Sequence, residues 1–309
     1  HNDDGVLDPT VNTRLITGLK VVGTPSDPII YVTSSDPRLT NDGGEDIDTN
    51  SGIVSKLIQN AGGGWDKVDL VRGLPRSTVD HAPHAVQLLE DSNTLLVAVG
   101  GLTNAGAPGE FFGNLPEYAL SAGFVSIDLD AIEALPTQTD ANGQQFKYNL
   151  PTLDDEDRPG STDANDPFGG NEGKNQAVLE ENGPVDIFAS GLRNPYDFVI
   201  NQHGLIYATD NGPNSSIGDV PLLDENGQPP NEPTQGGSSA KDALHLVSEG
   251  SYSGHPNPTR ANLNNTFNDT NPQSPVYTGD TEPCTYQHNV TDGALALFDT
   301  STNGITEYT

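Results

Sequence analysis

The chain of 309 residues lacks several features by which large protein classes are recognised. It contains one cysteine, Cys284, so no disulfide can form within it. It has no apolar run near the roughly 18 residues that a membrane-spanning helix needs, which predicts no membrane insertion. Aromatic residues make up only 6% of the chain and hydrophobic residues 33%. We therefore expect a folded protein with long polar loops.

Basic residues are scarce as well: 13 Lys and Arg stand against 44 Asp and Glu, and the formal net charge is −31. Such a charge repels phosphate backbones and anionic lipid surfaces, so nucleic acid is excluded as an expected partner. The acidic residues are spread through the chain, although 154–157 form a local cluster. This spread favours a solvation role in a saline environment, where salt screens self-repulsion, over a role in concentrating divalent cations.

Turn-forming residues, in contrast, are abundant: 34 Gly and 24 Pro indicate many turns and few long helices. Between the turns, short apolar segments form four clusters, each with three or four candidate strands. These clusters span 15–71, 85–189, 197–247 and 275–298. Each has the strand content of one propeller blade, so the predicted fold class is all-β, a β-propeller with about four blades in this chain. A β-sandwich is the alternative that the strand spacing leaves open.

We expect residues 1–309 to form part of a single propeller domain. Segment 136–180 is nearly free of large apolar residues, which predicts a long polar surface insert with little core of its own. A calcium site within 154–166 is a second interpretation of this segment, because carboxylates and loop carbonyls are ligands that calcium prefers.

The stretch 189–214 contains the candidate site residues with the clearest chemistry. Arg193 precedes a predicted strand and offers a planar fork of N–H donors to a carboxylate. The Asn194-Pro195 pair that follows forces an extended turn, which would fix the direction of the arginine. An anion-binding residue at the start of a strand is the prediction.

The other end of this stretch has the composition of a cation site. Gly212 and Pro213 follow a strand where consecutive carbonyl groups can turn inward. The Asp210 carboxylate and the Asn211 amide are close to them in sequence. Carboxylate, amide and carbonyl oxygens together would suit a hard cation such as calcium.

These two motifs, Gly191-x-Arg193-Asn194-Pro195 and Gly212-Pro213-Asn214, resemble the signature of the glucose/sorbosone dehydrogenase family. The resemblance implies a six-bladed β-propeller whose loops hold pyrroloquinoline quinone (PQQ) and Ca²⁺. It further implies that the remaining blades come from another chain or segment. The residues implied to contact the quinone are Arg193, Asn194 and Asn211, and those implied to bind the metal are Gly212, Pro213 and Asp210.

The same resemblance points to a catalytic histidine before the strand that ends at Val99. His81 is the best match for the base that takes the proton of the substrate hydroxyl, and His84 is the second choice. A histidine that merely packs at the start of a strand is the structural alternative. The acidic residue that orients this histidine in the family is replaced by Gly101, so we expect His81 to lack a side-chain partner. Residues 101–109 resemble an extracellular branch of the family.

Two functions follow as expectations. The first is the calcium- and PQQ-dependent oxidation of a sugar hydroxyl or hemiacetal by hydride transfer, with His81 as base and Arg193 stabilising negative charge. The second is a non-catalytic, calcium-stabilised propeller that serves as a binding or structural module. Both predict a carbohydrate or glycan as partner and an extracellular or secreted location. The first requires His81, Arg193 and Gly212 to meet at one polar cavity.

Overall fold

The computed structural model describes residues 13–38, 49–153, 176–177, 179–180, 182–220, 234–257, 294–299 and 301–308. Almost all regular structure in these residues is β-strand, and the one α-helix among them is the short α1 (Leu129–Ala134). This confirms the all-β prediction. None of the helices in the described part is long and apolar enough to cross a membrane.

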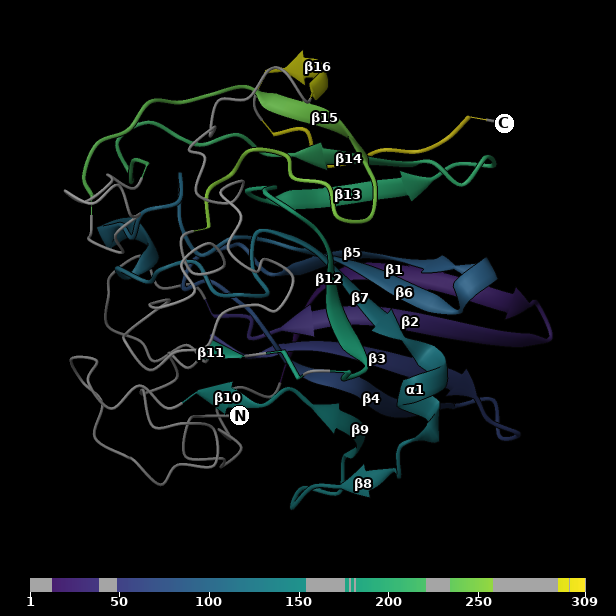
Figure 1. Cartoon of the computed structure of the whole chain (residues 1–309). Coiled ribbons are helices and arrows are strands. Elements are labelled where there is room, and N and C mark those ends of the chain that lie inside the picture. The colour runs from purple at the N-terminus through teal and green to yellow at the C-terminus, as the bar shows by residue number, and fades with distance from the viewer. Residues whose placement is uncertain are drawn as a thin grey trace.

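The strands form three four-stranded antiparallel meanders in succession along the chain (Figure 1). The first consists of β1 (Leu15–Thr24), β2 (Asp27–Ser35), β3 (Gly52–Gln59) and β4 (Trp65–Leu74). The second consists of β5 (Pro83–Leu89), β6 (Thr94–Val99), β7 (Gly123–Asp128) and β12 (Val185–Ser190). The third consists of β13 (Pro195–Ile200), β14 (Ile206–Asp210), β15 (Asp242–Val247) and β16 (Ala294–Phe298). A four-stranded meander of this kind is the repeating unit of a β-propeller.

The three sheets meet through their first strands, as blades do around a common axis. Strand β5 contacts both β1 and β13, and it lies between them in Figure 1. The middle sheet is covered on both faces, which explains the unbroken apolar run of β6. Leu95 and Val97 point into the core shared with the first sheet, whereas Leu96 and Ala98 point into the core shared with the third.

The one described strand of the predicted fourth cluster belongs to the third sheet. Strand β16 pairs with β15 and completes the third sheet, so it does not begin a fourth one. The described residues therefore hold three sheets of blade size, fewer than the four blades expected. The rest of that cluster, with Cys284, lies outside the described residues.

The polar segment 136–180 also departs from the prediction in its first part. Strands β8 (Gln138–Thr139) and β9 (Gln145–Asn149) extend the first sheet, and β9 pairs in parallel with β4. Phe146 is buried there beneath the guanidinium of Arg72, which lies 4.5 Å from the ring centroid. Two short strands, β10 (Thr152–Leu153) and β11 (Gln176–Ala177), pair with each other. Residues 154–166, the alternative calcium segment, lie outside the described residues.

Candidate functional site

Loops from all three sheets surround one cavity of about 490 Å³. The predicted site residues that line it are His81, His84, Arg193, Asn194, Asn211 and Gly212. Two predicted metal ligands, Asp210 and Pro213, are not among its lining residues. His81, Arg193 and Gly212, which the dehydrogenase hypothesis requires to meet at one cavity, all line it.

His81 is buried in the connection between β4 and β5, and its ring has one fixed hydrogen bond. Its Nδ1 lies 2.8 Å from the carbonyl oxygen of Gly101, an atom that can only accept, so Nδ1 carries the proton. Nε2 therefore keeps its lone pair, 3.9 Å from a carboxylate oxygen of Asp80, which also lines the cavity. Burial, and next the charge of Arg193, hold the pKa of His81 well below its usual value. His81 is thus a neutral imidazole with a free basic nitrogen.

The ring of His81 is oriented although Gly101 offers it no side chain. The orienting group is the backbone carbonyl of Gly101. Any residue type at position 101 would have this carbonyl. The loop before the histidine is held just as firmly. The hydroxyl of Ser77 accepts hydrogen bonds from the backbone N–H of Val79 and of His81. The fully buried guanidinium of Arg76 binds backbone carbonyls of the same loop, including that of Val79 at 2.8 Å.

His84 serves a different purpose from His81. Its Nε2 lies 2.8 Å from Oδ1 of Asn194, and its ring packs at 4.5 Å from the ring of Tyr196. Burial lowers the pKa of His84 to about 4, so it too is neutral. Because Nε2 is engaged with Asn194, His84 holds that amide in place at the cavity wall. The other ring nitrogen of His84, Nδ1, is buried and has no hydrogen-bond partner among the described residues, so each of the two histidines has one ring nitrogen outside these hydrogen bonds.

Arg193 is buried at the cavity wall with part of its hydrogen-bonding capacity unused. Its Nε donates to the carbonyl of Asn104 at 2.8 Å, and Nη2 donates to the Asn104 side chain at 3.0 Å. Its Nη1 donates to the carbonyl of Asn211 at 3.3 Å. A guanidinium has five N–H groups, so two of them are not used by the residues that the structure describes. The sequence analysis assigned no role to Asn104, although it lies in the segment 101–109 that carries part of the family resemblance.

Asp210 organises the backbone beside the arginine. Its two carboxylate oxygens accept from the N–H of Arg193 at 2.9 Å and from the N–H of Asn194 at 2.7 Å. Burial raises the pKa of Asp210 above its usual value. The ligand role predicted for Asp210 gains no support from this arrangement, because both oxygens already hold the Arg193-Asn194 turn.

Of the remaining candidate cation ligands, Gly212 and Asn211 line the cavity and Pro213 does not. Gly212 lines the cavity, and its N–H donates to the carboxylate of Asp242, which is also in the lining. The Pro213 carbonyl accepts from the N–H of Ala240 at 2.9 Å. Asn211 has a buried side-chain oxygen with no hydrogen-bond partner in the described part of the chain. In the described part of the chain, no group of three or more His, Cys, Asp or Glu residues is placed to hold a metal. A cation here would need carbonyl or amide oxygens in addition to a carboxylate such as that of Asp242.

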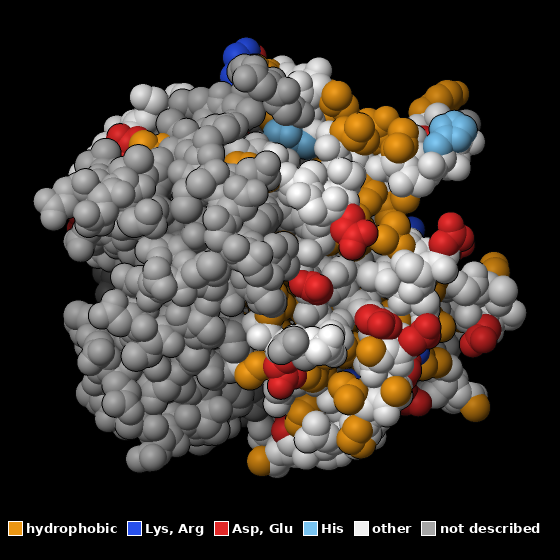
Figure 2. Space-filling view, viewed as in Figure 1, with side chains coloured by type: hydrophobic (Ala, Val, Ile, Leu, Met, Phe, Trp, Pro, Cys, Tyr) orange, Lys and Arg blue, Asp and Glu red, His pale blue; other side chains and the backbone are white. Residues whose placement is uncertain are grey.

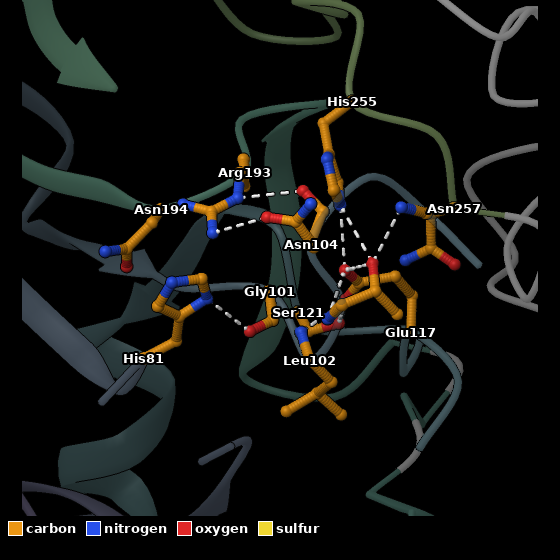
Figure 3. A network of polar contacts seen from close by, with 12 residues as sticks. His81, Gly101, Leu102, Asn104, Glu117, Ser121, Arg193, Asn194, His255 and Asn257 are labelled. Atoms are coloured by element: carbon orange, nitrogen blue, oxygen red, sulfur yellow. Dashed lines mark hydrogen bonds and ion pairs between the residues drawn. The ribbon is translucent and has the colours of Figure 1, made fainter. Parts of the chain in front are cut away.

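Glu117 is the second residue that sequence reasoning missed. It is fully buried, and it forms a polar network with His255 and the loop that begins at Gly101 (Figure 3). It lies close to position 101, where the resemblance places an acidic side chain. Glu117 is sixteen residues from position 101 along the chain, so no pattern in the sequence indicated that the two are close in space.

Comparisons with known proteins give a limited result. No protein-family model and no curated protein matches the chain. Among solved structures, an oxidoreductase (glucose dehydrogenase) from Thermus thermophilus has a TM-score of 0.33 at 14% identity, over 74% of this chain and 46% of its own. The PQQ domain of pyranose dehydrogenase from Coprinopsis cinerea, in its holo form, has a TM-score of 0.36 at 11% identity, over 79% of this chain and 55% of its own. The chain thus spans about half the length of these structures.

Proposed function

We propose that this chain takes part in the oxidation of a sugar hydroxyl or hemiacetal by hydride transfer to a quinone. One observation carries the proposal: His81, whose Nε2 is free, and Arg193, whose guanidinium is only partly used, line the same cavity. A neutral imidazole is suited to accept a hydroxyl proton, and a fixed cation beside it stabilises the negative charge that develops.

In this mechanism His81 Nε2 takes the proton of the substrate hydroxyl while a hydride leaves the carbon that bears it. The Nδ1–H of His81 remains hydrogen-bonded to the Gly101 carbonyl, and this hydrogen bond keeps the ring in the reactive orientation. A bound quinone would supply the hydride acceptor. Because the pKa of His81 is held well below its usual value, the base is ready at neutral pH. We expect the rate to be flat through neutral pH and to fall only in acid.

Parts of the cavity lining offer contacts to each of the two implied groups. The two spare N–H groups of Arg193 fit a carboxylate or quinone oxygen. The unpartnered side-chain oxygen of Asn211, together with the lining residues Gly212 and Asp242, suits a hard cation such as Ca²⁺. Arg193, Asn194 and Asn211 would hold the quinone, and Gly212 with the Asn211 oxygen would hold the metal.

The second candidate function, a non-catalytic carbohydrate-binding propeller, is favoured by one specific observation. Arg193 is the one Lys or Arg in the described cavity lining, against the carboxylates of Asp80 and Asp242. PQQ carries three carboxylates, which a single guanidinium does not neutralise. A cavity of this charge suits a neutral, hydroxyl-rich ligand better than a tricarboxylate.

Reconstitution separates the two functions. The chain is incubated with PQQ and CaCl₂, and the reduction of a redox dye is measured with a panel of sugars. Under the proposal, His81→Ala reduces the rate by about 10²–10⁴-fold, the usual contribution of a general base. The control His203→Ala, at an exposed turn, leaves the rate unchanged. Sugar binding without dye reduction in the loaded wild type would support the binding module and overturn the dehydrogenase.

A further inference from the structure

We propose that Glu117 is a positioning residue for both His81 and Arg193, acting through the backbone of residues 101–104. The inference rests on the proposed function for its catalytic consequence, but its structural part is independent of the reaction.

The first step is the number of hydrogen bonds that converge on Glu117. Its oxygens accept from the N–H of Leu102 at 2.8 Å, the N–H of Thr103 at 3.1 Å and the hydroxyl of Thr103 at 2.6 Å. They also accept from the hydroxyl of Ser121 and from Nε2 of His255 at 2.8 Å (Figure 3). Five donors around a fully buried carboxylate fix it and the segments that carry the donors.

The second step is the charge of the group. Burial alone would raise the pKa of Glu117, but the hydrogen bonds from His255, Ser121 and Thr103 outweigh it and hold the pKa below its usual value. Glu117 is thus a carboxylate at neutral pH. Its charge also acts on Arg193, whose positive form it favours.

The third step is that the segment held by Glu117 carries the groups that orient both site residues. The Gly101 carbonyl binds Nδ1 of His81, and the Gly101 N–H donates to the Arg193 carbonyl at 2.7 Å. Asn104, at the other end of the segment, accepts two hydrogen bonds from the Arg193 guanidinium. Leu102 and Thr103, between these ends, donate the two backbone hydrogen bonds to Glu117. One carboxylate therefore fixes the segment on which His81 and Arg193 both depend.

The fourth step is the space at position 101. A Cβ added to Gly101 would lie 2.6 Å from Oε1 of Glu117 and 2.9 Å from the carbonyl oxygen of Arg193. Both distances are shorter than non-bonded contacts allow. The Glu117 carboxylate thus occupies the volume into which a side chain at 101 would project, and glycine at 101 is the condition for this arrangement.

The test is Glu117→Gln, which keeps the size of the side chain but places an NH₂ group among five donors. Glu110→Gln is the matched control, because Glu110 is exposed on the same loop. ¹⁵N NMR of the histidine rings reports the His81 tautomer, with its signal assigned by loss in His81→Ala. We expect the Nδ1–H form to dominate in the wild type and in Glu110→Gln, and a mixture of both tautomers in Glu117→Gln.

The kinetic readout is made on the chain loaded with PQQ and CaCl₂. We expect Glu117→Gln to lower kcat by about 10–100-fold with a smaller change in KM, as a displaced catalytic group does. A folded Glu117→Gln with an unchanged His81 tautomer would overturn the positioning role. A changed tautomer in a chain that shows no dye reduction even as wild type would support the positioning role and overturn only the dehydrogenase proposal.

If Glu117→Gln does not fold, Ser121→Ala tests the positioning role of Glu117 instead. This variant removes one of the five donors and leaves the carboxylate in place. The inference expects a smaller shift of the His81 tautomer in the same direction. No shift in a folded Ser121→Ala, with the Glu117 hydrogen bonds otherwise intact, would overturn it.

Discussion

His84 illustrates how a buried titratable group at the cavity wall links the site to stability. Its ring is almost completely buried, and its Nε2 is engaged with the Asn194 amide. Protonation would place a charge in a site that burial keeps free of water, which is why the pKa falls to about 4. An unfolded histidine titrates near 6.5, so the folded and unfolded states bind different numbers of protons between these two values.

The sign of the pH dependence follows. Above about pH 6.5 both states are neutral at His84, and the contribution to stability is complete; as the pH falls toward 4, the unfolded state takes up the proton first. We therefore expect the protonation of His84 to lower the free energy of unfolding by about 3 kcal/mol when the pH falls from 7 to 4. Urea unfolding at both pH values measures this. His84→Gln should show a flatter pH dependence than the wild type, and an equal slope in the two proteins would contradict the buried neutral histidine.

At the scale of elements, the loop that follows β6 determines the geometry of the site. It begins at Gly100 and Gly101, where the chain leaves a strand that is buried on both faces. A Cβ at Gly100 would lie 2.6 Å from Oδ1 of Asn194 and 2.8 Å from the Cβ of His81. The two glycines let the backbone pass between the site residues.

Gly101→Ala tests this close approach. The added methyl group would meet the Glu117 carboxylate and a backbone oxygen that has no rotamer with which to move away. We expect a loss of about 1–3 kcal/mol of unfolding free energy, the usual cost of overpacking a buried site. Denaturant unfolding gives the value, and Gly304→Ala, where a Cβ meets no atom within 4 Å, is the control. A loss no larger than that of the control would mean that the loop adjusts freely.

For the whole molecule, the formal net charge of −31 is the dominant electrostatic feature. On the face shown in Figure 2, the described acidic side chains are scattered among neutral and apolar ones, with no single patch. Repulsion among charges spread in this way acts over the molecule and is weakened by salt, with a Debye length of about 10 Å at 0.1 M and about 3 Å at 1 M.

We accordingly expect the Tm to rise between 0.1 M and 2 M NaCl. Thermal unfolding followed by circular dichroism measures it. Sucrose at matched osmolarity is the control for solvent exclusion, because it leaves charges unscreened. A Tm that rises equally in sucrose, or not at all in NaCl, would show that self-repulsion does not limit the stability of this chain.

Calcium requires a separate measurement at constant high ionic strength. A cation that binds the folded state alone raises the Tm by mass action, so CaCl₂ in excess should raise it and a chelator should lower it. The shift is expected to be smaller in Asn211→Ala, which removes the unpartnered side-chain oxygen at the cavity. Identical melting curves with chelator and with CaCl₂ would remove calcium from the proposed site.

The sequence by itself determined the strands and most of their grouping. Apolar runs such as 29–32 and 95–99 are local patterns, and a strand needs little more than such a pattern between turn residues. The first two predicted clusters each became one sheet for this reason. The Arg193-Asn194 turn and His81 were likewise recognised from short motifs, and both line the cavity.

Only the tertiary structure decided the contacts between segments far apart in the chain. The pairing of β16 with β15, across the undescribed residues 258–293, is an example at the scale of strands. The partner of His81 is a backbone carbonyl, a group that every residue has and that no sequence pattern marks. Glu117 is one of 44 acidic residues, and what separates it from the others is burial among five donors. Burial and hydrogen bonding of this kind arise from packing, which local sequence does not encode.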